Sequence, residues 1–327
     1  MLTSTRGFAS HDGRNSENRV AAMAHAARMT TAPATYEAAP ALSGLRPPRI
    51  SVWRRLPQTD PVAVIAIVVG LLIVLVALAA PFLPLADPDA TNLGARLVPP
   101  FQDGYLLGTD HLGRDLLSRI VWGARVSLTI GFFAALIAST AGAVTGIVGG
   151  YFGGSVDHLL MRFIDVVLAF PYVLLAIALV AALGPGLFNA MIAIALVNIA
   201  FYARNIRGSV LSIRNQGYVD AARASGGSNT HILVRHVLPN VVAPLLVLIS
   251  MNVGWMITET AGLSFLGLGA QPPQADWGSM LADGRDFITV AYHVATIPGI
   301  AILILVLTLN VIGDAMRDLL DPRMRAR

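Results

Sequence analysis

The stretch YVDAARASGGSNTHILVRHVLPN, from Tyr218 to Asn240, is a polar segment that lies between two long apolar runs. It carries two arginines, one aspartate and a pair of adjacent glycines. The whole chain is 55% hydrophobic and only 13% charged, whereas a soluble domain of this length has about 25% charged residues. This contrast predicts an all-α polytopic membrane protein in which the quoted stretch is a loop outside the membrane.

The apolar runs that contain no charged residue predict six transmembrane helices, because about 20 apolar residues span the hydrocarbon core. The third run is too long for one span and is divided by Gly184, Pro185 and Gly186. The predicted spans are residues 62–83, 127–150, 163–183, 187–203, 240–262 and 294–313. Residues 1–57 have few large apolar side chains and are predicted to be a disordered tail; the true start could be Met1, Met23 or Met29.

The arginines then set the predicted orientation in the membrane. With the N-terminus inside, 18 arginines fall on the inner side and five on the outer side, and cytoplasmic segments carry the excess of basic residues. Both termini and the loop of residues 204–239 are therefore predicted to be cytoplasmic. The outer arginines are Arg96, Arg114, Arg119, Arg125 and Arg285.

Composition excludes several kinds of chemistry. The chain has no Cys, which excludes disulfides and thiolate metal sites, and all 23 of its basic residues are Arg. A P-loop requires a lysine at the phosphates, so we expect no ATP bound by this chain. No H-E-x-x-H or G-x-S-x-G motif occurs, so we expect no metal and no catalytic residue, and the protein is not predicted to be an enzyme. The arginines are scattered, which argues against nucleic acid as a partner.

The first half of the quoted loop has the pattern of a short helix. Val219, Ala222 and Gly226 recur at helical spacing, and Asp220 and Arg223 form an i,i+3 pair of favourable order. The alanines and glycines would let another protein surface come close. The alternative, which periodicity alone favours, is that this small-residue face packs on the protein's own bundle.

The second half of the loop predicts another short helix at an angle to the first. The two glycines at 226–227 end the first helix, since glycine takes the left-handed conformation without strain. Ser228 can then cap a second helix, and Pro239 marks the point where the chain re-enters the membrane.

The pattern D-A-A-x-x-x-G followed by L-P resembles the EAA loop of ABC-importer permeases, although Asp replaces the usual Glu and His236 stands where many members have an aliphatic residue. In that family the loop is a coupling helix seated on a cytoplasmic ATPase. The resemblance implies an ATPase-coupling role for Tyr218, Asp220, Ala221, Ala222, Arg223, Gly226, Leu238 and Pro239.

Three further stretches are similar to the C-type permeases of dipeptide, oligopeptide and nickel importers: LLGTDHLGRDLLSR at 106–119, LSFLGLGAQPP at 263–273 and GDAMRDLLDPR at 313–323. The resemblance implies a type I ABC importer permease fold in a bacterial inner membrane. Its implied partners are a homologous B-type permease, two ATPases that carry ATP-Mg, an extracytoplasmic solute-binding protein and membrane lipid. Peptides are the expected cargo, with nickel or another solute as the alternative.

The chain is therefore predicted to have four parts. Residues 1–57 form the cytoplasmic tail, 58–125 the first span and an extracytoplasmic segment, 126–316 the permease domain with its coupling loop, and 317–327 a cytoplasmic C-terminal tail. An ion-coupled secondary transporter is the main alternative, but such proteins show internal repeats and buried ionisable residues. The spans here are nearly free of charge, and the residues that line the pathway are unknown.

Several single residues have two interpretations. The G-x-x-x-G ladder in residues 142–150 predicts close helix packing. Asp110 and Arg114 are predicted to form a surface pair in a turn, in preference to a contact with the binding protein. Asp157 is predicted to belong to a solvated cluster at the membrane interface. Glu259 lies near the outer end of the fifth span; it could be functional, face water, or face an arginine of a partner subunit.

Overall fold

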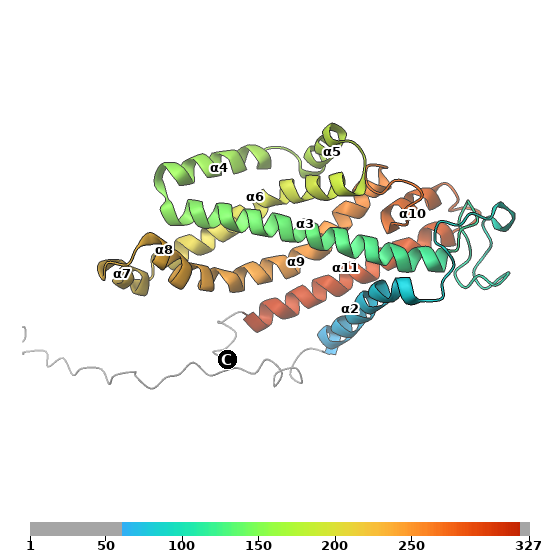
Figure 1. Ribbon diagram of the computed structural model, residues 1–327, viewed down its shortest axis with the longest axis horizontal. Coiled ribbons are helices and arrows are strands. Elements are labelled where there is room, and N and C mark those ends of the chain that lie inside the picture. Colours follow the sequence, from blue (N-terminus) through green and yellow to red (C-terminus); the bar gives the residue numbers. More distant parts are fainter. Residues whose placement is uncertain (1–60, 321–327) are drawn as a thin grey trace, which may run out of the picture. The chain divides into compact units, whose positions relative to one another are not determined.

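The computed structural model describes residues 61–320, and its regular elements are all helices (Figure 1). In chain order the elements are α2 (Pro61–Ala79), η3 (Ala80–Phe82), η4 (Leu93–Ala95), α3 (Leu116–Phe152), α4 (Gly154–Leu168), α5 (Tyr172–Leu183), α6 (Leu187–Arg214), α7 (Gly217–Ala224), α8 (Asn229–Ile232), η5 (Leu233–Val237), α9 (Leu238–Phe265), α10 (Trp277–Arg285) and α11 (His293–Leu320). The tail predicted at residues 1–57 lies outside the described residues.

Five helical stretches in the described range are long and apolar enough to cross a membrane. They are Pro61–Phe82, Leu116–Phe152, Leu187–Arg214, Asn229–Phe265 and His293–Leu319. The pair α4 and α5 is a sixth candidate, bent by 92° at the break between the two helices. The predicted all-α polytopic fold is therefore confirmed, with its third span present as a bent pair.

The prediction of a single helix over residues 163–183 was wrong, because this range is divided between α4 and α5. Pro171 stands at the N-cap of α5 with an extended ψ of 125°, and a proline has no N–H with which to continue the hydrogen bonds of α4. The residue before a proline is also pushed out of the helical region. The apolar run therefore folds as two helices that meet at a sharp angle. The predicted break at 184–186 does separate α5 from α6.

Two helices extend well beyond their predicted spans. Helix α3 begins at Leu116 rather than at 127, because the carboxylate of Asp115 accepts a hydrogen bond from the Ser118 N–H and caps it. Helix α6 continues to Arg214 rather than ending at 203. A charge-free run measures the length inside hydrocarbon, whereas a helix can continue past it into water.

The glycine ladder packs α3 against α6, which run side by side in Figure 1. A Cβ added at Gly142 would lie 2.4 Å from Cβ of Tyr202, and one at Gly146 would lie 2.5 Å from the carbonyl oxygen of Ala203. A Cβ at Gly150 would lie 2.9 Å from that of Val210. The predicted role of this ladder in close packing is confirmed.

The end of the bundle that holds α10 is covered by residues 84–115 and 265–292, and we call it the α10 end. Here Arg114 Nε donates to Asp110 Oδ2 at 2.6 Å, and both side chains are only 4% exposed. The prediction of a surface pair was therefore wrong in its location, because Arg119, which is 2% exposed, and the loops of this end enclose the pair. Trp277 fastens α10 to α3 by donating to the Ile120 carbonyl at 2.9 Å.

Candidate functional site

Helix α7 lies at the opposite end of the bundle from α10, just after α6 (Figure 1). Its eight residues, Gly217–Ala224, include three alanines and a single large aliphatic side chain, Val219. An isolated helix of this length is not stable in water. The conformation of α7 therefore depends on how its residues contact the bundle.

Val219 is the residue that fixes α7 to the bundle. Its side chain is fully buried in a cluster with Ile206 and Val210 of α6 and with Ile232 of α8, and Ala222 packs against the same cluster. The face that contains Val219 and Ala222 therefore packs on the protein's own bundle, as periodicity alone favoured. This face is not available to a partner.

The opposite face of α7 is exposed, and we call it the α7 ridge. It consists of Tyr218, Asp220, Ala221, Arg223 and the neighbouring Gly226. Arg223 Nη1 lies 3.2 Å from Asp220 Oδ1, and the two side chains are 48% and 65% exposed, so this ion pair adds little stability. The small residue Ala221 lies at the centre of the ridge, between the ion pair and the side chain of Tyr218, which is 46% exposed. Such a ridge can enter a groove on another protein.

The turn after α7 has the predicted chemistry. Gly226 adopts a φ of +82°, which glycine tolerates best, and Ser228 Oγ accepts a hydrogen bond from the His231 N–H at 3.3 Å. The second helix is not separate, however. Helix α8 passes through the π-helical turn η5 directly into α9, so one continuous helical stretch runs from Asn229 to Phe265. The predicted re-entry point at Pro239 is the second residue of α9 and lies inside this continuous stretch, directly after the π-helical turn η5. A proline has no N–H to donate, and here it stands where the π-helical turn passes into α-helix.

The structure brings together some of the predicted coupling residues and separates others. The ring of Tyr218 lies 6.1 Å from that of His236 in η5, which joins the α7 ridge to the second half of the loop. Leu238 and Pro239 are exposed on the same end of the molecule at the start of α9. Ala222 is the exception among the predicted residues, because it contacts the bundle.

Polar contacts that sequence reasoning missed connect this end of the molecule to the spans. Tyr151 of α3 donates its hydroxyl to Asn229 Oδ1 of α8 at 3.0 Å. Arg214, at the end of α6, donates to the carbonyl oxygen of Tyr151 at 3.0 Å. These partners are far apart in the sequence, so no local pattern reveals them. They join α8 and the end of α6 to the same residue of α3.

A second missed contact connects α4 to α6. Arg207 donates to both carboxylate oxygens of Asp157, at 2.5 and 2.6 Å. The Asp157 side chain is only 12% exposed, so the prediction of a solvated cluster was wrong for this residue. A bidentate pair of this kind fixes orientation as well as distance.

No group of three His, Asp or Glu side chains within residues 61–320 could hold a metal ion.

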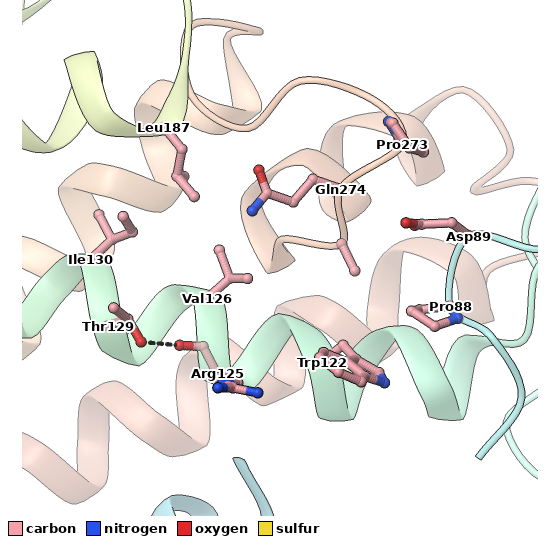
Figure 2. Close-up of a pocket in the computed structure, with 11 residues that line it drawn as sticks. Pro88, Asp89, Trp122, Arg125, Val126, Thr129, Ile130, Leu187, Pro273 and Gln274 are labelled. Carbon is pink, nitrogen blue, oxygen red and sulfur yellow. Dashed lines mark hydrogen bonds between the residues drawn. The ribbon is translucent and has the colours of Figure 1, made fainter. Parts of the chain in front are cut away.

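A cavity of about 420 Å³ lies at the α10 end (Figure 2). Its floor is α3, which contributes Trp122, Arg125, Val126 and Thr129, and Figure 2 shows Asp89 and Gln274 on the loops above it. Thr129 Oγ1 donates to the Arg125 carbonyl at 2.6 Å and is thereby held against the helix. The cavity combines an apolar wall with one acidic and one basic side chain, Asp89 and Arg125, and it lies far from the α7 ridge.

Comparison with known proteins places these features in context. Residues 138–326 match the family described as the binding-protein-dependent transport system inner membrane component. Residues 48–100 match the N-terminal transmembrane domain of oligopeptide transport permease C.

Curated relatives match over most of their length. A dipeptide transport system permease protein of Alkalihalophilus pseudofirmus is 43% identical over 280 residues, which cover 85% of this chain and 92% of the relative. A probable D,D-dipeptide permease of Escherichia coli is 43% identical over 81% of this chain and 88% of its own. A glutathione permease of Pectobacterium atrosepticum is 41% identical over 86% and 93%.

Among solved structures, a chain of the MetNI methionine ABC transporter superimposes with a TM-score of 0.52. The two are 17% identical, and the match covers 62% of this chain and 96% of the other. This likeness concerns the fold alone.

Proposed function

Because the chain belongs to the inner membrane components of binding-protein-dependent transport systems, and to their oligopeptide permease C type, we propose that it imports short peptides as one half of an ATP-driven translocation pathway. It is a multi-pass transport subunit and not an ATPase. ATP-Mg is therefore assigned to partner subunits, and the chain itself is proposed to bind no cofactor.

The observation that carries the peptide assignment is the identity of 43% over 85% of the chain to a dipeptide permease. Relatives at similar identity are named for D,D-dipeptides and for glutathione, and these are also short peptides. Nickel remains the alternative cargo. A permease of this kind receives its cargo from a binding protein, so the two cargoes are distinguished by uptake rather than by fold.

The two ends of the bundle are proposed to contact different partner proteins. A homologous B-type permease would complete the pathway, two ATPases would dock at the α7 end, and a solute-binding protein would dock at the α10 end. The excess of arginines on the α7 side supports a cytoplasmic location for that end and for both termini. The exposed α7 ridge, with Ala221 at its centre, is the proposed ATPase contact.

The proposed mechanism uses α7 as the point where force enters the bundle. Val219 anchors α7 beside Ile232 of α8, and α8 continues without a break into α9. Closure of the ATPases on ATP would therefore move α7 and α9 together and open the pathway to the outer side. Hydrolysis would release them and return the bundle to an inward-open state, as in other two-state membrane machines.

Reconstitution in proteoliposomes tests this function. The chain is inserted together with the B-type permease and the two ATPases, and uptake of labelled Ala-Ala is measured with the binding protein present. We expect uptake that requires ATP inside and the binding protein outside, and no comparable uptake of nickel. Uptake driven by an ion gradient in vesicles without the ATPases would contradict the proposal and favour the secondary transporter.

A further inference from the structure

The exposed side of α9 carries apolar side chains such as Val242 and Leu246, but one stripe nearer the α10 end contains a carboxylate and an amide. Asn252, Trp255, Glu259 and Gly262 follow one another at spacings of three and four, so they form a stripe along this helix. Trp255 is 53% exposed, Gly262 is exposed, and Asn252 and Glu259 are half-buried. The opposite face of α9 is buried in the core and includes Met256, Ile257 and Leu263.

The other exposed spans are different in character. On α2 the exposed side chains include Leu71, Leu72 and Leu75, and on α11 they include Leu303 and Leu307. Aliphatic faces of this kind suit contact with acyl chains. A carboxylate and an amide on a lipid-facing surface would be strongly unfavourable. The polar stripe on α9 therefore belongs against water or another protein, and not against lipid.

Within residues 61–320, Glu259 has no counter-ion. It is the single glutamate in residues 61–320, and no basic side chain in that part of the chain forms an ion pair with it. Within electrostatic range lies the hydroxyl of Tyr172 at the start of α5, which accepts a hydrogen bond from Asn198 of α6 at 2.7 Å. Among the described residues the carboxylate has no cationic partner, so it is available to a cation from outside the subunit.

We propose that the stripe Asn252–Gly262 of α9 lines the transport pathway and that Glu259 and Trp255 bind the ammonium group of the cargo peptide's amino terminus during passage. This inference rests on the proposed peptide-import function. Residues four apart on a helix are neighbours, so a cation beside the Glu259 carboxylate also meets the indole of Trp255, and aromatic faces attract cations. Glu259 and Trp255 together would make this part of the pathway bind the ammonium group of a zwitterionic peptide in preference to its carboxylate.

The first test is accessibility, and the natural absence of Cys in this chain makes it direct. Single substitutions Trp255→Cys and Gly262→Cys are made in the full transporter and treated with a membrane-impermeant thiol reagent. Leu303→Cys is the matched control, because Leu303 is 55% exposed and Trp255 53%. Leu303 lies ten residues from the His293 end of α11, and Trp255 lies ten residues from the Phe265 end of α9.

We expect the two α9 positions to react about tenfold faster than Leu303→Cys, because a thiol in hydrocarbon is not ionised. Equal and slow reaction at all three positions would overturn the pathway assignment. If the partner permease instead covers this stripe, for example with an arginine at Glu259, the α9 positions will also react slowly, and that result too would overturn the pathway assignment.

The second test measures the charge at the site. Trp255→Cys is treated in parallel with a cationic and an anionic thiol reagent of similar size. We expect the cationic reagent to react about fivefold faster, and this preference to disappear when Glu259→Gln is added, since the carboxylate one turn away attracts the cation. No preference, or a preference unchanged by Glu259→Gln, would overturn the role of Glu259.

The peptide site itself is tested by protection in the same vesicles. Binding protein loaded with Ala-Ala should slow modification of Trp255→Cys, and Glu259→Gln should lower Ala-Ala uptake while Glu259→Asp restores it. If uptake of Ala-Ala is normal but protection is absent and Glu259→Gln has no effect, this inference is wrong. If the wild-type transporter takes up no Ala-Ala at all, the proposed function is wrong.

Discussion

Gly146 shows how one residue sets the distance between two helices. A Cβ there would meet backbone atoms of Ala203 and Arg207 at 2.5 and 2.9 Å, and backbone cannot move aside as a flexible side chain can. The ladder to which Gly146 belongs was readable in the sequence, because small residues at i,i+4 have one main use in membrane helices.

Substitution of Gly146 should therefore destabilise the bundle. Gly146→Leu forces α3 away from α6, and overpacking of this kind costs about 1–3 kcal/mol or more. We expect a clearly lower Tm in detergent and poor recovery from the membrane. The matched control is Gly208→Leu on α6, where an added Cβ meets nothing within 4 Å; similar losses for both variants would contradict the packing account.

Asp276, the N-cap of α10, gives a prediction on pH. Its carboxylate accepts hydrogen bonds from the Ser279 N–H and from Ser127 Oγ, both at 3.2 Å, and burial raises the pKa of this carboxyl above its usual range. The folded state therefore favours the protonated form. The stability that this gives is present at low pH and is lost as pH rises through the raised pKa.

Asp276→Asn keeps the hydrogen-bond acceptor and the cap but removes the titration. We expect the Tm of the variant to exceed that of the wild type by a margin that grows from about pH 4 towards about pH 8. Thermal melts of both proteins at several pH values measure the margin. A margin that stays constant with pH would show that Asp276 is not the titrating group.

At the scale of the element, α7 depends on one buried side chain. Val219 is the only fully buried residue of this helix, so Val219→Asp should release α7 while the spans remain packed. We expect faster tryptic cleavage after Arg223 in inverted vesicles with little change at other sites. Ala221→Asp on the exposed face is the control, and equal cleavage of the two variants would contradict the anchoring role of Val219.

The sequence predicted the number and order of the spans because charge-free runs of sufficient length have few other uses. It failed at the bend between α4 and α5, since a proline such as Pro171 inside an apolar run is tolerated in many continuous membrane helices. It also failed to show that α8 continues into α9. Gly226–Gly227 and Ser228 were legible as local signals, whereas the continuity depends on η5, a turn without a sequence signature.

At the scale of the whole molecule, the contacts that join distant segments were not predictable. Asp157 and Arg207 are 50 residues apart, and their pairing depends on how α4 folds back along α6. The burial of Asp110 and Arg114 likewise depends on loops from both halves of the chain. The sequence predicts a coupling role for residues 218–239 as a whole, but only the structure separates the anchoring face of α7 from its exposed ridge.

The proposed orientation gives a prediction for intact cells. Asn215 is exposed at the α7 end and Ala90 at the α10 end. An impermeant maleimide added outside should label Ala90→Cys at once and Asn215→Cys only after the membrane is permeabilised, since the arginine-rich side stays inside. Labelling of Asn215→Cys in sealed cells would reverse the topology and remove the α7 ridge from reach of cytoplasmic ATPases.

We propose that the α7 ridge receives the work of ATP hydrolysis, and the substitution Ala221→Trp tests this role. Ala221 is exposed, so a tryptophan there obstructs a partner without disturbing the bundle. Ala222→Trp, in contrast, would disturb the bundle, because Ala222 packs against the cluster around Val219. The measurement is Ala-Ala uptake per ATP hydrolysed in the reconstituted transporter, with Leu71→Trp on the exposed aliphatic face of α2 as the control. We predict normal membrane insertion and an uptake per ATP reduced about tenfold or more, as expected for loss of an interface contact; wild-type coupling in Ala221→Trp would contradict the account.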